Sequence, residues 1–483
     1  MKAAIGLDIG TTAIKCMAVG EDGRVLASSR RDLTRSFPHP GWTEQDPVEI
    51  LDLSVSAIRD AMASCEAHIS SLGIAHQGET CLVWNRTTGR PLYPAITWQD
   101  RREARKADEL SMRKGEEIER RTGIKCDSYY SAFKIRWMLD TLEIQDESEV
   151  LAGTLNTWLV WNLTKGKVFA TDEGSSCCTL LRNPRETGWS GEMLEIFSIN
   201  EEILPSILDS DSFFGFSDPS FFGYEIPILA SLIDSAAAMV ASGVLSPGDF
   251  ISTYGTGNFI HLVTDGFVEP ADGLTSSIAF SRGGIRRYQL NGICYSAGSA
   301  INWLRDSLGL FCNDDELTGI MEGENRSGVF FVPALDGIAT PYWRGDARGS
   351  FFGLAEGTEK KDLVRAVLES SALQVAHTVS IMERMSGISP KVLTVMGGMT
   401  RNDALMRYQA GLLGIDVVVP KESEPAFGSA LFALGKEKDE IQEINGPDRI
   451  FHPSMDGRQA LELKERWLKA VESTLLWHGH MIG

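Results

Sequence analysis

Short apolar runs that end in glycine or polar residues predict buried β-strands in the first part of the chain. Residues 3–5 predict a strand that delivers Asp8 at its end, and residues 71–75 predict another that leads into polar positions. Two further runs, 14–19 and 25–28, flank a turn-forming stretch, as in a β-meander. This part of the chain is therefore expected to form a sheet.

Apolar residues at helical spacing alternate with these strands. One helix is expected to begin after Asp46, which suits the N-cap, with Pro47 at the first helical position. Its core-facing residues are Leu51, Val55, Ile58 and Met62. An amphipathic helix is expected around residues 133–138, and an alanine-rich helix begins at Asp234. Strands that alternate with helices indicate the α/β class.

The second half of the chain repeats this order of a loop, a β-rich run and helices. Its expected elements are a helix over 362–385 that stops at Gly387, strands at 392–395 and 415–419, and a small-residue helix over 425–434. Turn residues cluster at 246–249, and 483 residues exceed one compact core. Two domains are therefore predicted, residues 1–245 and 246–483.

Composition narrows the range of partners and settings. The chain is 43% hydrophobic and 23% charged, which is ordinary for a soluble globular protein. A net charge of −20 argues against a nucleic-acid partner, which would require clustered lysine and arginine. Eight cysteines without a Cys-x-x-Cys pair favour reduced thiols and a cytoplasmic setting. No signal-peptide pattern occurs and no apolar run reaches the ~18 residues that span a bilayer, so no membrane partner is expected.

A loop around Gly10 is the strongest candidate for chemistry. Gly10 permits a tight turn, and the amides and hydroxyls of Thr11 and Thr12 can surround an anion. An acidic residue beside an anion site makes sense when a divalent cation lies between them, so Asp8 is expected to face Mg²⁺ next to ATP phosphates. The alternative is a surface hairpin with Asp and Gly at the turn. A second loop of this kind, over 251–257, favours the phosphate-loop interpretation.

The chain has no Gly-x-x-x-x-Gly-Lys-Ser/Thr motif, so a P-loop enzyme is excluded. Its own motifs follow one another at residues 6–12, 41–47, 73–80, 98–102, 153–158, 254–257, 333–353 and 397–398. Together and in this order they resemble the FGGY family of carbohydrate kinases, and within it most closely the glycerol kinases. The resemblance extends from Ile5 to about Leu434.

The resemblance implies two ribonuclease-H-like α/β domains of the actin and hexokinase superfold, with the active site in the cleft between them. ATP would lie in this cleft, and Asp8 would face Mg²⁺. Lys15 stands where glycerol kinases have an arginine, which keeps the charge but loses the planar fork. The implied ATP-binding residues are Gly10, Thr11, Thr12, Lys15, Gly255, Thr256, Gly257, Gly298, Ile301, Asn302, Gly397, Gly398 and Asn402. For the later glycines, plain strand–helix turns are the alternative.

The resemblance and the local sequence both point to Asp234 as general base. Phosphoryl transfer needs a group that accepts the proton of the attacking hydroxyl, and a lone carboxylate after the apolar Ile233 fits that need. The alternative is a helix N-cap, and both roles are compatible. The implied substrate-binding residues are Gly78, Glu79, Trp98, Tyr129, Asp234, Ser235 and Phe259. Taken singly, residues such as Trp98 and Phe259 are more often core residues than ligands.

Two positions depart from the glycerol-kinase pattern, and both lie at the substrate. Glycerol kinases have an arginine where this chain has Gly78, and a glutamine where it has Ser235. We therefore expect a small polyol or ketose larger than glycerol, of roughly four to six carbons, because the space that the two long side chains leave admits further carbons and hydroxyls. One alternative is glycerol itself, with a lysine or arginine from elsewhere, such as Arg101 or Arg102, refilling the space. Others are an actin- or chaperone-like ATPase that acts on proteins, and a sugar-binding regulator. The expected assembly is a homodimer.

Overall fold

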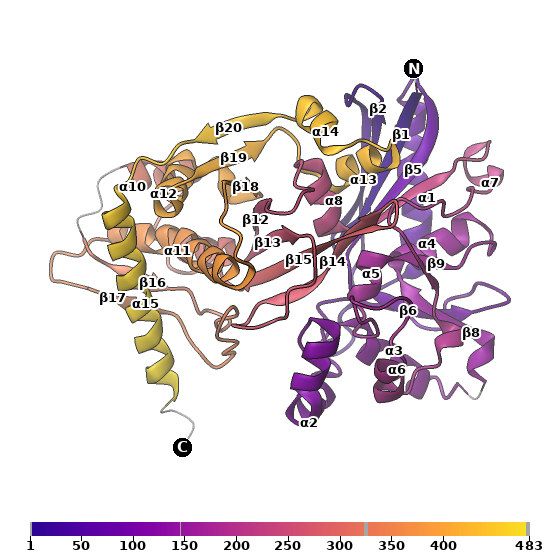
Figure 1. Cartoon of the computed structure of the whole chain (residues 1–483), viewed down its shortest axis with the longest axis horizontal. Helices are drawn as coiled ribbons and strands as arrows, with labels where there is room; N and C mark the ends of the chain where they lie inside the picture. The colour runs from indigo at the N-terminus through magenta and orange to yellow at the C-terminus, as the bar shows by residue number, and fades with distance from the viewer. Residues whose placement is uncertain (1, 145, 323–326, 480–483) are drawn as a thin grey trace.

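The computed structural model describes residues 2–144, 146–322 and 327–479, which form two main β-sheets surrounded by helices (Figure 1). The first sheet has the strand order β11-β5-β1-β2-β3. Its strands are β1 (Lys2–Ile9), β2 (Ala13–Gly20), β3 (Val25–Asp32), β5 (His68–His76) and β11 (Ile228–Ile233). Strands β1, β2 and β3 are antiparallel, whereas β5 runs parallel to β1 and β11. The predicted meander and buried strands are present.

The carboxyl ends of β1, β5 and β11 meet at one edge of the first sheet. In the register, Asp8 of β1 lies beside Ala75 of β5, which lies beside Leu232 of β11. Asp234 follows β11 directly and begins α8 (Asp234–Ala241). The two carboxylates that the sequence singled out therefore lie at the same edge, where open α/β sheets bind ligands.

The second sheet has the strand order β14-β15-β13-β12-β18-β19-β20. Its strands are β12 (Phe250–Tyr254), β13 (Asn258–Thr264), β14 (Thr275–Arg282), β15 (Ile285–Cys294), β18 (Val392–Met396), β19 (Asp416–Pro420) and β20 (Pro447–Phe451). The long helix α11 (Lys360–Ser386) shares a hydrophobic core with this sheet and ends at Gly387, which is left-handed with φ 70°. The predicted helix and its stop signal are both found.

One helix from the second half of the chain packs on the first sheet. Helix α13 (Pro425–Ala433) lies against β1 and β5 and beside α8 (Figure 1). A Cβ atom at Gly6 would lie 1.7 Å from the carbonyl oxygen of Ala426, and one at Gly73 would lie 2.1 Å from that of Ser429. Glycine at these strand positions therefore allows the close approach of the helix. The predicted domain boundary between residues 245 and 246 stays a prediction, because α13 belongs to the second half of the chain but packs on the first sheet.

Smaller elements surround the two main sheets. The remaining strands are β4 (Glu44–Gln45), β6 (Cys81–Asn85), β7 (Ala95–Ile96), β8 (Val150–Thr154), β9 (Ala170–Asp172), β10 (Ser206–Leu208), β16 (Phe330–Val332) and β17 (Ser350–Phe352). The remaining α-helices are α1 (Pro47–Ala63), α2 (Ala104–Thr122), α3 (Ser131–Thr141), α4 (Leu155–Leu163), α5 (Glu173–Cys177), α6 (Gly191–Phe197), α7 (Pro219–Phe222), α9 (Gly298–Asn302), α10 (Asp314–Glu322), α12 (Asp403–Leu413), α14 (Lys438–Ile444) and α15 (Gly457–Gly479). The Asp46 side chain caps α1, as predicted. Among the described residues, no helix is both long and apolar enough to cross a membrane.

Candidate active site

A cavity of about 480 Å³ is lined by residues from both halves of the chain. The predicted site residues on its wall are Thr11, Gly78, Glu79, Trp98, Tyr129, Asp234, Ser235, Phe259 and Gly397. Every residue that the sequence assigned to the substrate is among them. The fold thus brings together side chains that lie far apart in the sequence.

Asp234 lines this cavity from the first turn of α8. The backbone N–H of Ser235 donates to Asp234 Oδ1 at 2.6 Å. Burial raises the pKa of Asp234 to about 6, and this hydrogen bond offsets the rise only in part. The N-cap position belongs to Ile233, so Asp234 is the first helical residue and not the cap. A carboxylate with a pKa near neutrality suits proton acceptance.

Glu79 lines the cavity and lies close to a buried lysine, Lys134, which is outside the lining. Burial raises the pKa of Glu79 to about 7, and the charge of Lys134 opposes this rise. Lys134 is 1% exposed, and its Nζ donates to the carbonyl oxygens of Tyr129 at 2.7 Å and Thr97 at 3.3 Å. It therefore fixes the backbone of a cavity residue. Lys134 was not predicted; its only signal is a lysine within the apolar pattern of the helix at 133–138.

Asp8 is almost fully buried, at 6% exposure, and its Oδ1 has no hydrogen-bond partner. Burial, followed by the neighbouring Asp234 charge, raises the pKa of Asp8 to about 8, whereas Lys15 lowers it. Lys15 itself forms an ion pair with Glu424, just before α13. An unpartnered carboxylate oxygen fits Mg²⁺, which takes one or two carboxylates together with phosphate oxygens and water. The described part of the chain has no cluster of three or more side chains of the metal-ligating types His, Cys, Asp and Glu.

Two glutamines form hydrogen bonds with the first predicted phosphate loop. The Trp98 indole N–H donates to Thr11 Oγ1 at 3.0 Å, and this hydroxyl donates to Gln77 Oε1 at 3.2 Å. Gln45 Nε2 donates to the Thr11 carbonyl oxygen at 2.9 Å, and Gln77 Nε2 donates to Gln45 Oε1 at 2.7 Å. The loop and the wall that carries Trp98 are therefore one hydrogen-bonded unit. Neither glutamine was predicted as a site residue.

The second predicted phosphate loop, residues 255–257, follows β12 and contacts the start of α9. The N–H of Gly298 donates to the Gly255 carbonyl oxygen at 3.0 Å. Gly397 has φ 98°, and a Cβ atom on it would lie 2.3 Å from the Tyr254 carbonyl oxygen. These glycines occur where three backbone segments converge, so a side chain at Gly397 would not fit.

The other predicted nucleotide-side residues occupy varied positions. Ile301 is buried in the core of the second sheet, and Asn302 accepts a hydrogen bond from a guanidinium one turn later at 3.0 Å. Asn402 is the N-cap of α12. Gly398 and Thr12 are exposed. Ile301, Asn302 and Asn402 thus have structural contacts of their own.

The surroundings of Gly78 bear on the predicted substrate pocket. A Cβ atom at Gly78 would lie 3.2 Å from Cys178 Sγ, so a thiol occupies part of the space that a longer side chain would take. Arg102 forms ion pairs with Asp100 and Glu44, and its side chain is 1% exposed. Arg101, which pairs with an aspartate, and Arg102 both lie outside the cavity lining. An arginine does not refill the space from these positions.

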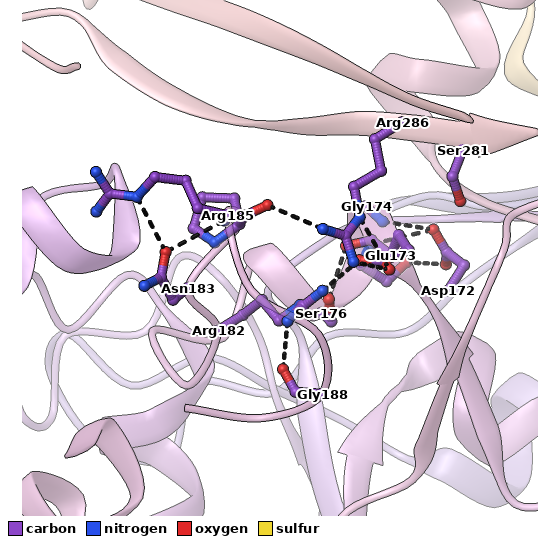
Figure 2. A network of polar contacts seen from close by, with 12 residues as sticks. Asp172, Glu173, Gly174, Ser176, Arg182, Asn183, Arg185, Gly188, Ser281 and Arg286 are labelled. Atoms are coloured by element: carbon purple, nitrogen blue, oxygen red, sulfur yellow. Dashed lines mark hydrogen bonds and ion pairs between the residues drawn. The ribbon is translucent and has the colours of Figure 1, made fainter. Parts of the chain in front are cut away.

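An ion-pair network joins α5 of the first half to β15 of the second half, as Figure 2 shows. Glu173 accepts from Arg182 Nη2 at 2.7 Å on one oxygen and from Arg286 Nη2 at 2.7 Å on the other. The Arg182 side chain is fully buried. Asp172 caps α5, and Cys178 follows this helix and lines the cavity. The network therefore holds one wall of the cavity against the second sheet.

Comparison with known proteins identifies the class. Residues 3–241 match the N-terminal domain of the FGGY family of carbohydrate kinases, and residues 251–435 match the C-terminal domain of that family. The chain therefore belongs to the FGGY family of carbohydrate kinases. The family predicted from the sequence is confirmed, and so are the two-domain α/β fold and the kinase class.

Particular relatives are glycerol kinases. The chain is 37% identical to "Glycerol kinase 2" of Thermotoga maritima over 99% of both chains. It is also 37% identical to a glycerol kinase of Trichodesmium erythraeum, over 99% of this chain and 98% of the relative. Among solved structures, Plasmodium falciparum glycerol kinase with ADP superimposes with a TM-score of 0.94 at 31% identity, covering 98% of both chains.

Proposed function

We propose that this kinase transfers the γ-phosphoryl group of ATP to a hydroxyl group of a small polyol or ketose. One observation carries the proposal above all. Asp234 lines the cavity, and burial raises the pKa of its carboxyl group to about 6. Phosphoryl transfer depends on positioning, charge neutralisation and a group that accepts the proton of the attacking hydroxyl. Asp234 accepts that proton, and Glu79 and Trp98 orient the substrate.

The nucleotide would lie against the two glycine-containing loops. Thr11 and Thr12 face its phosphates on one side, and residues 255–257 on the other. Asp8 would hold Mg²⁺, and its buried, unpartnered Oδ1 supports this assignment. When bound, Mg²⁺ neutralises charge on the phosphate oxygens. Lys15 lies next to Asp8 and adds positive charge, although Glu424 shares it.

The substrate is proposed to be larger than glycerol. Gly78 and Ser235 replace two long side chains of the glycerol-kinase pattern, and both line the cavity. The competing substrate is glycerol, which the names of the relatives favour. An ATPase that acts on proteins is disfavoured, because a cavity of about 480 Å³ with convergent carboxylates and aromatic rings suits a small ligand.

Assembly, location and domain division remain predictions. A homodimer and a cytoplasmic setting are proposed, the latter because all eight cysteines are free. Residues 1–245 and 246–483 would act as two domains that close over the substrates and exclude water. Light scattering after size-exclusion chromatography tests the dimer.

The function is tested by coupled detection of ADP release. The purified protein is supplied with Mg·ATP and, one at a time, glycerol, four- to six-carbon polyols, pentuloses and hexuloses. We expect turnover that requires one of these acceptors and is lost in Asp234→Asn. ATP hydrolysis at an unchanged rate without any acceptor would favour the ATPase alternative instead.

A further inference from the structure

One wall of the cavity is polar and was not predicted from the sequence. It consists of His261, Thr275, Ser277, Gln289 and Asn291, all of which line the cavity. We call this group the distal wall. Its residues belong to β13, β14 and β15 of the second half, whereas Glu79, Trp98 and Asp234 belong to the first. The cavity therefore has polar groups on two opposing sides of the cleft.

The strand register places the distal wall in successive rows. Phe259 of β13 lies opposite Ile293 of β15 and next to the second phosphate loop. The following row holds His261 opposite Asn291, with Thr275 on the far side of Asn291. Because a strand rises about 3.4 Å per residue, this row lies about 7 Å farther from the loop than Phe259. The polar row thus begins beyond the apolar row that is nearest the phosphates.

The last row pairs Gln289 of β15 with Ser277 of β14. Gln289 Nε2 donates to Ser277 Oγ at 3.1 Å. Gln289 is 3% exposed, yet its Oε1 has no hydrogen-bond partner. A buried amide oxygen without a partner is costly, and a ligand that donates to it removes that cost. This atom is an open acceptor on the cavity wall.

His261 supplies a second acceptor. Its Nδ1 lies 2.7 Å from Asn291 Oδ1, and an amide oxygen only accepts, so Nδ1 carries the proton. Burial lowers the pKa of His261, and contacts with the Asn291 and Gln289 side chains oppose this only in part, so the ring is neutral near pH 7. Nε2 then faces the Gln289 side chain without a proton, so it can only accept a hydrogen bond.

The charges around the cavity are one-sided. Its acidic residues are Glu79, Asp234 and Glu424, and no lysine or arginine is found among the described residues that line it. Carboxylates, a neutral imidazole and an amide oxygen all accept hydrogen bonds. The wall therefore matches a neutral ligand rich in O–H donors. A carboxylate or phosphate at the same end would meet hydrogen-bond acceptors, and no described lysine or arginine of the lining would balance its charge.

We infer that the distal wall binds the hydroxyl groups at the far end of the substrate, and that the substrate is a neutral polyol or ketose of about five carbons that spans both halves of the cleft. This inference rests on the proposed function. The reacting hydroxyl lies beside Asp234, and the last hydroxyls donate to His261 and Gln289. We expect glycerol held at Asp234 to leave these two acceptors without a contact. Wild-type protein should therefore discriminate against an aldonate of similar length.

The test combines turnover and binding. Gln289→Ala and His261→Leu are compared with wild type and with Gln459→Ala, which makes the same chemical change on the exposed face of α15. For xylitol, ribitol or D-arabinitol we expect kcat/KM to fall about tenfold or more in both wall variants, as for the loss of a hydrogen bond to a desolvated acceptor. For glycerol we expect a change of less than about twofold, and the control should match wild type for every substrate. Wild type should use D-gluconate poorly.

Binding measurements distinguish a failure of the distal-wall inference from a failure of the proposed function. Calorimetric titration of Asp234→Asn with the pentitols measures their affinity for the cavity in the absence of phosphoryl transfer. Titration of each wall variant with ADP checks that the variant is folded. Pentitols that bind the Asp234→Asn protein but lose affinity with Gln289→Ala would support the wall even if no turnover occurred. Equal losses for glycerol and pentitols, a preference for D-gluconate, or no binding of any neutral polyol or ketose of this size would overturn the inference.

Discussion

Asp8 and Asp234 lie at the carboxyl edge of one sheet, separated by the single strand β5. Burial and then the charge of Asp234 raise the pKa of Asp8 to about 8, and burial raises the pKa of Asp234 to about 6. Two carboxylates so placed resist being charged together. A cation at Asp8 would relieve this repulsion and keep Asp234 available as a base.

Replacement of the proposed base is the first prediction. Asp234→Asn keeps the size of the side chain but cannot accept a proton, and loss of a positioned base costs ~10²–10⁴ in rate. We expect kcat to fall in this range while ADP affinity, measured by calorimetry, stays close to that of wild type. Turnover near the wild-type rate on the true substrate would remove Asp234 from the mechanism.

The pH dependence follows from the same carboxylate. Asp234 must be ionised to accept a proton, and its pKa is about 6. Activity should therefore fall as the pH drops through about 6, approaching a tenfold loss per pH unit. The measurement is kcat/KM between pH 5 and pH 8 in constant ionic strength. A profile whose acidic limb lies near pH 4 would mean that burial does not shift this group.

Asp8 gives a prediction for stability in the absence of metal. Its folded pKa of about 8 lies above the ordinary value of 3.8, so the folded protein binds the proton more tightly than the unfolded chain. The stability that this proton gives is complete below pH 3.8 and is lost as the pH rises toward 8. Asp8→Asn cannot ionise, so its thermal midpoint should decline less than that of wild type between pH 5 and pH 8. Parallel declines for the two proteins would contradict the shift.

The same position tests the assignment of Mg²⁺. In Asp8→Ala, calorimetric titration with the polyol alone should resemble wild type, because Asp8 lies outside the cavity lining. Mg²⁺-dependent turnover of ATP should collapse, since the carboxylate ligand is gone. Intact turnover in this variant would show that the first loop does not serve Mg·ATP.

The Glu173 network predicts a large effect on stability. Glu173→Gln leaves the fully buried Arg182 and the partly buried Arg286 without a negative partner. Removing one member of a buried ion pair typically costs about 3–5 kcal/mol. The midpoint of urea unfolding should fall far more than in Asp265→Asn, which breaks an exposed pair with Arg287 worth about 0–1 kcal/mol. Equal midpoints for the two variants would mean that the network contributes little.

Much of the fold could be predicted because its elements have local signals. Asp46 caps α1 with its own side chain, and Gly387 ends α11 in the left-handed conformation. The apolar runs of β1 and β5 also predicted these strands directly from the sequence. In contrast, the packing of α13 on the first sheet depends on Gly6 and Gly73 meeting backbone atoms that are distant in sequence. No local pattern reports such a contact.

The site residues also fall into two groups, those that the sequence predicted and those that only the structure shows. Most of the predicted substrate residues converge because they lie at strand ends, where the topology brings them together, whereas Tyr129 lies in the loop before α3. Lys134 and Gln77 escaped prediction because their roles depend on hydrogen-bond partners elsewhere in the chain, not on their neighbours in sequence. The distal wall was missed for the same reason. Strands in which polar and apolar residues alternate are ordinary in any sheet with an exposed face, so a single polar residue such as His261 gives no signal. Only the register shows that they share one face.

The last prediction concerns the two positions that set this chain apart from the glycerol-kinase pattern. Gly78→Arg combined with Ser235→Gln restores both long side chains, and Cys178→Ala is added because its sulfur would lie 3.2 Å from the new Cβ atom. A charge-assisted hydrogen bond from the arginine contributes about 1.5–3 kcal/mol, which corresponds to roughly ten- to a hundredfold. We therefore expect kcat/KM for glycerol to rise by this factor and kcat/KM for pentitols to fall, because the new side chains fill the cavity. Cys178→Ala alone is the reference for the added room. If wild type already prefers glycerol to every larger polyol and ketose, the two substitutions do not enlarge the pocket, and the substrate is glycerol.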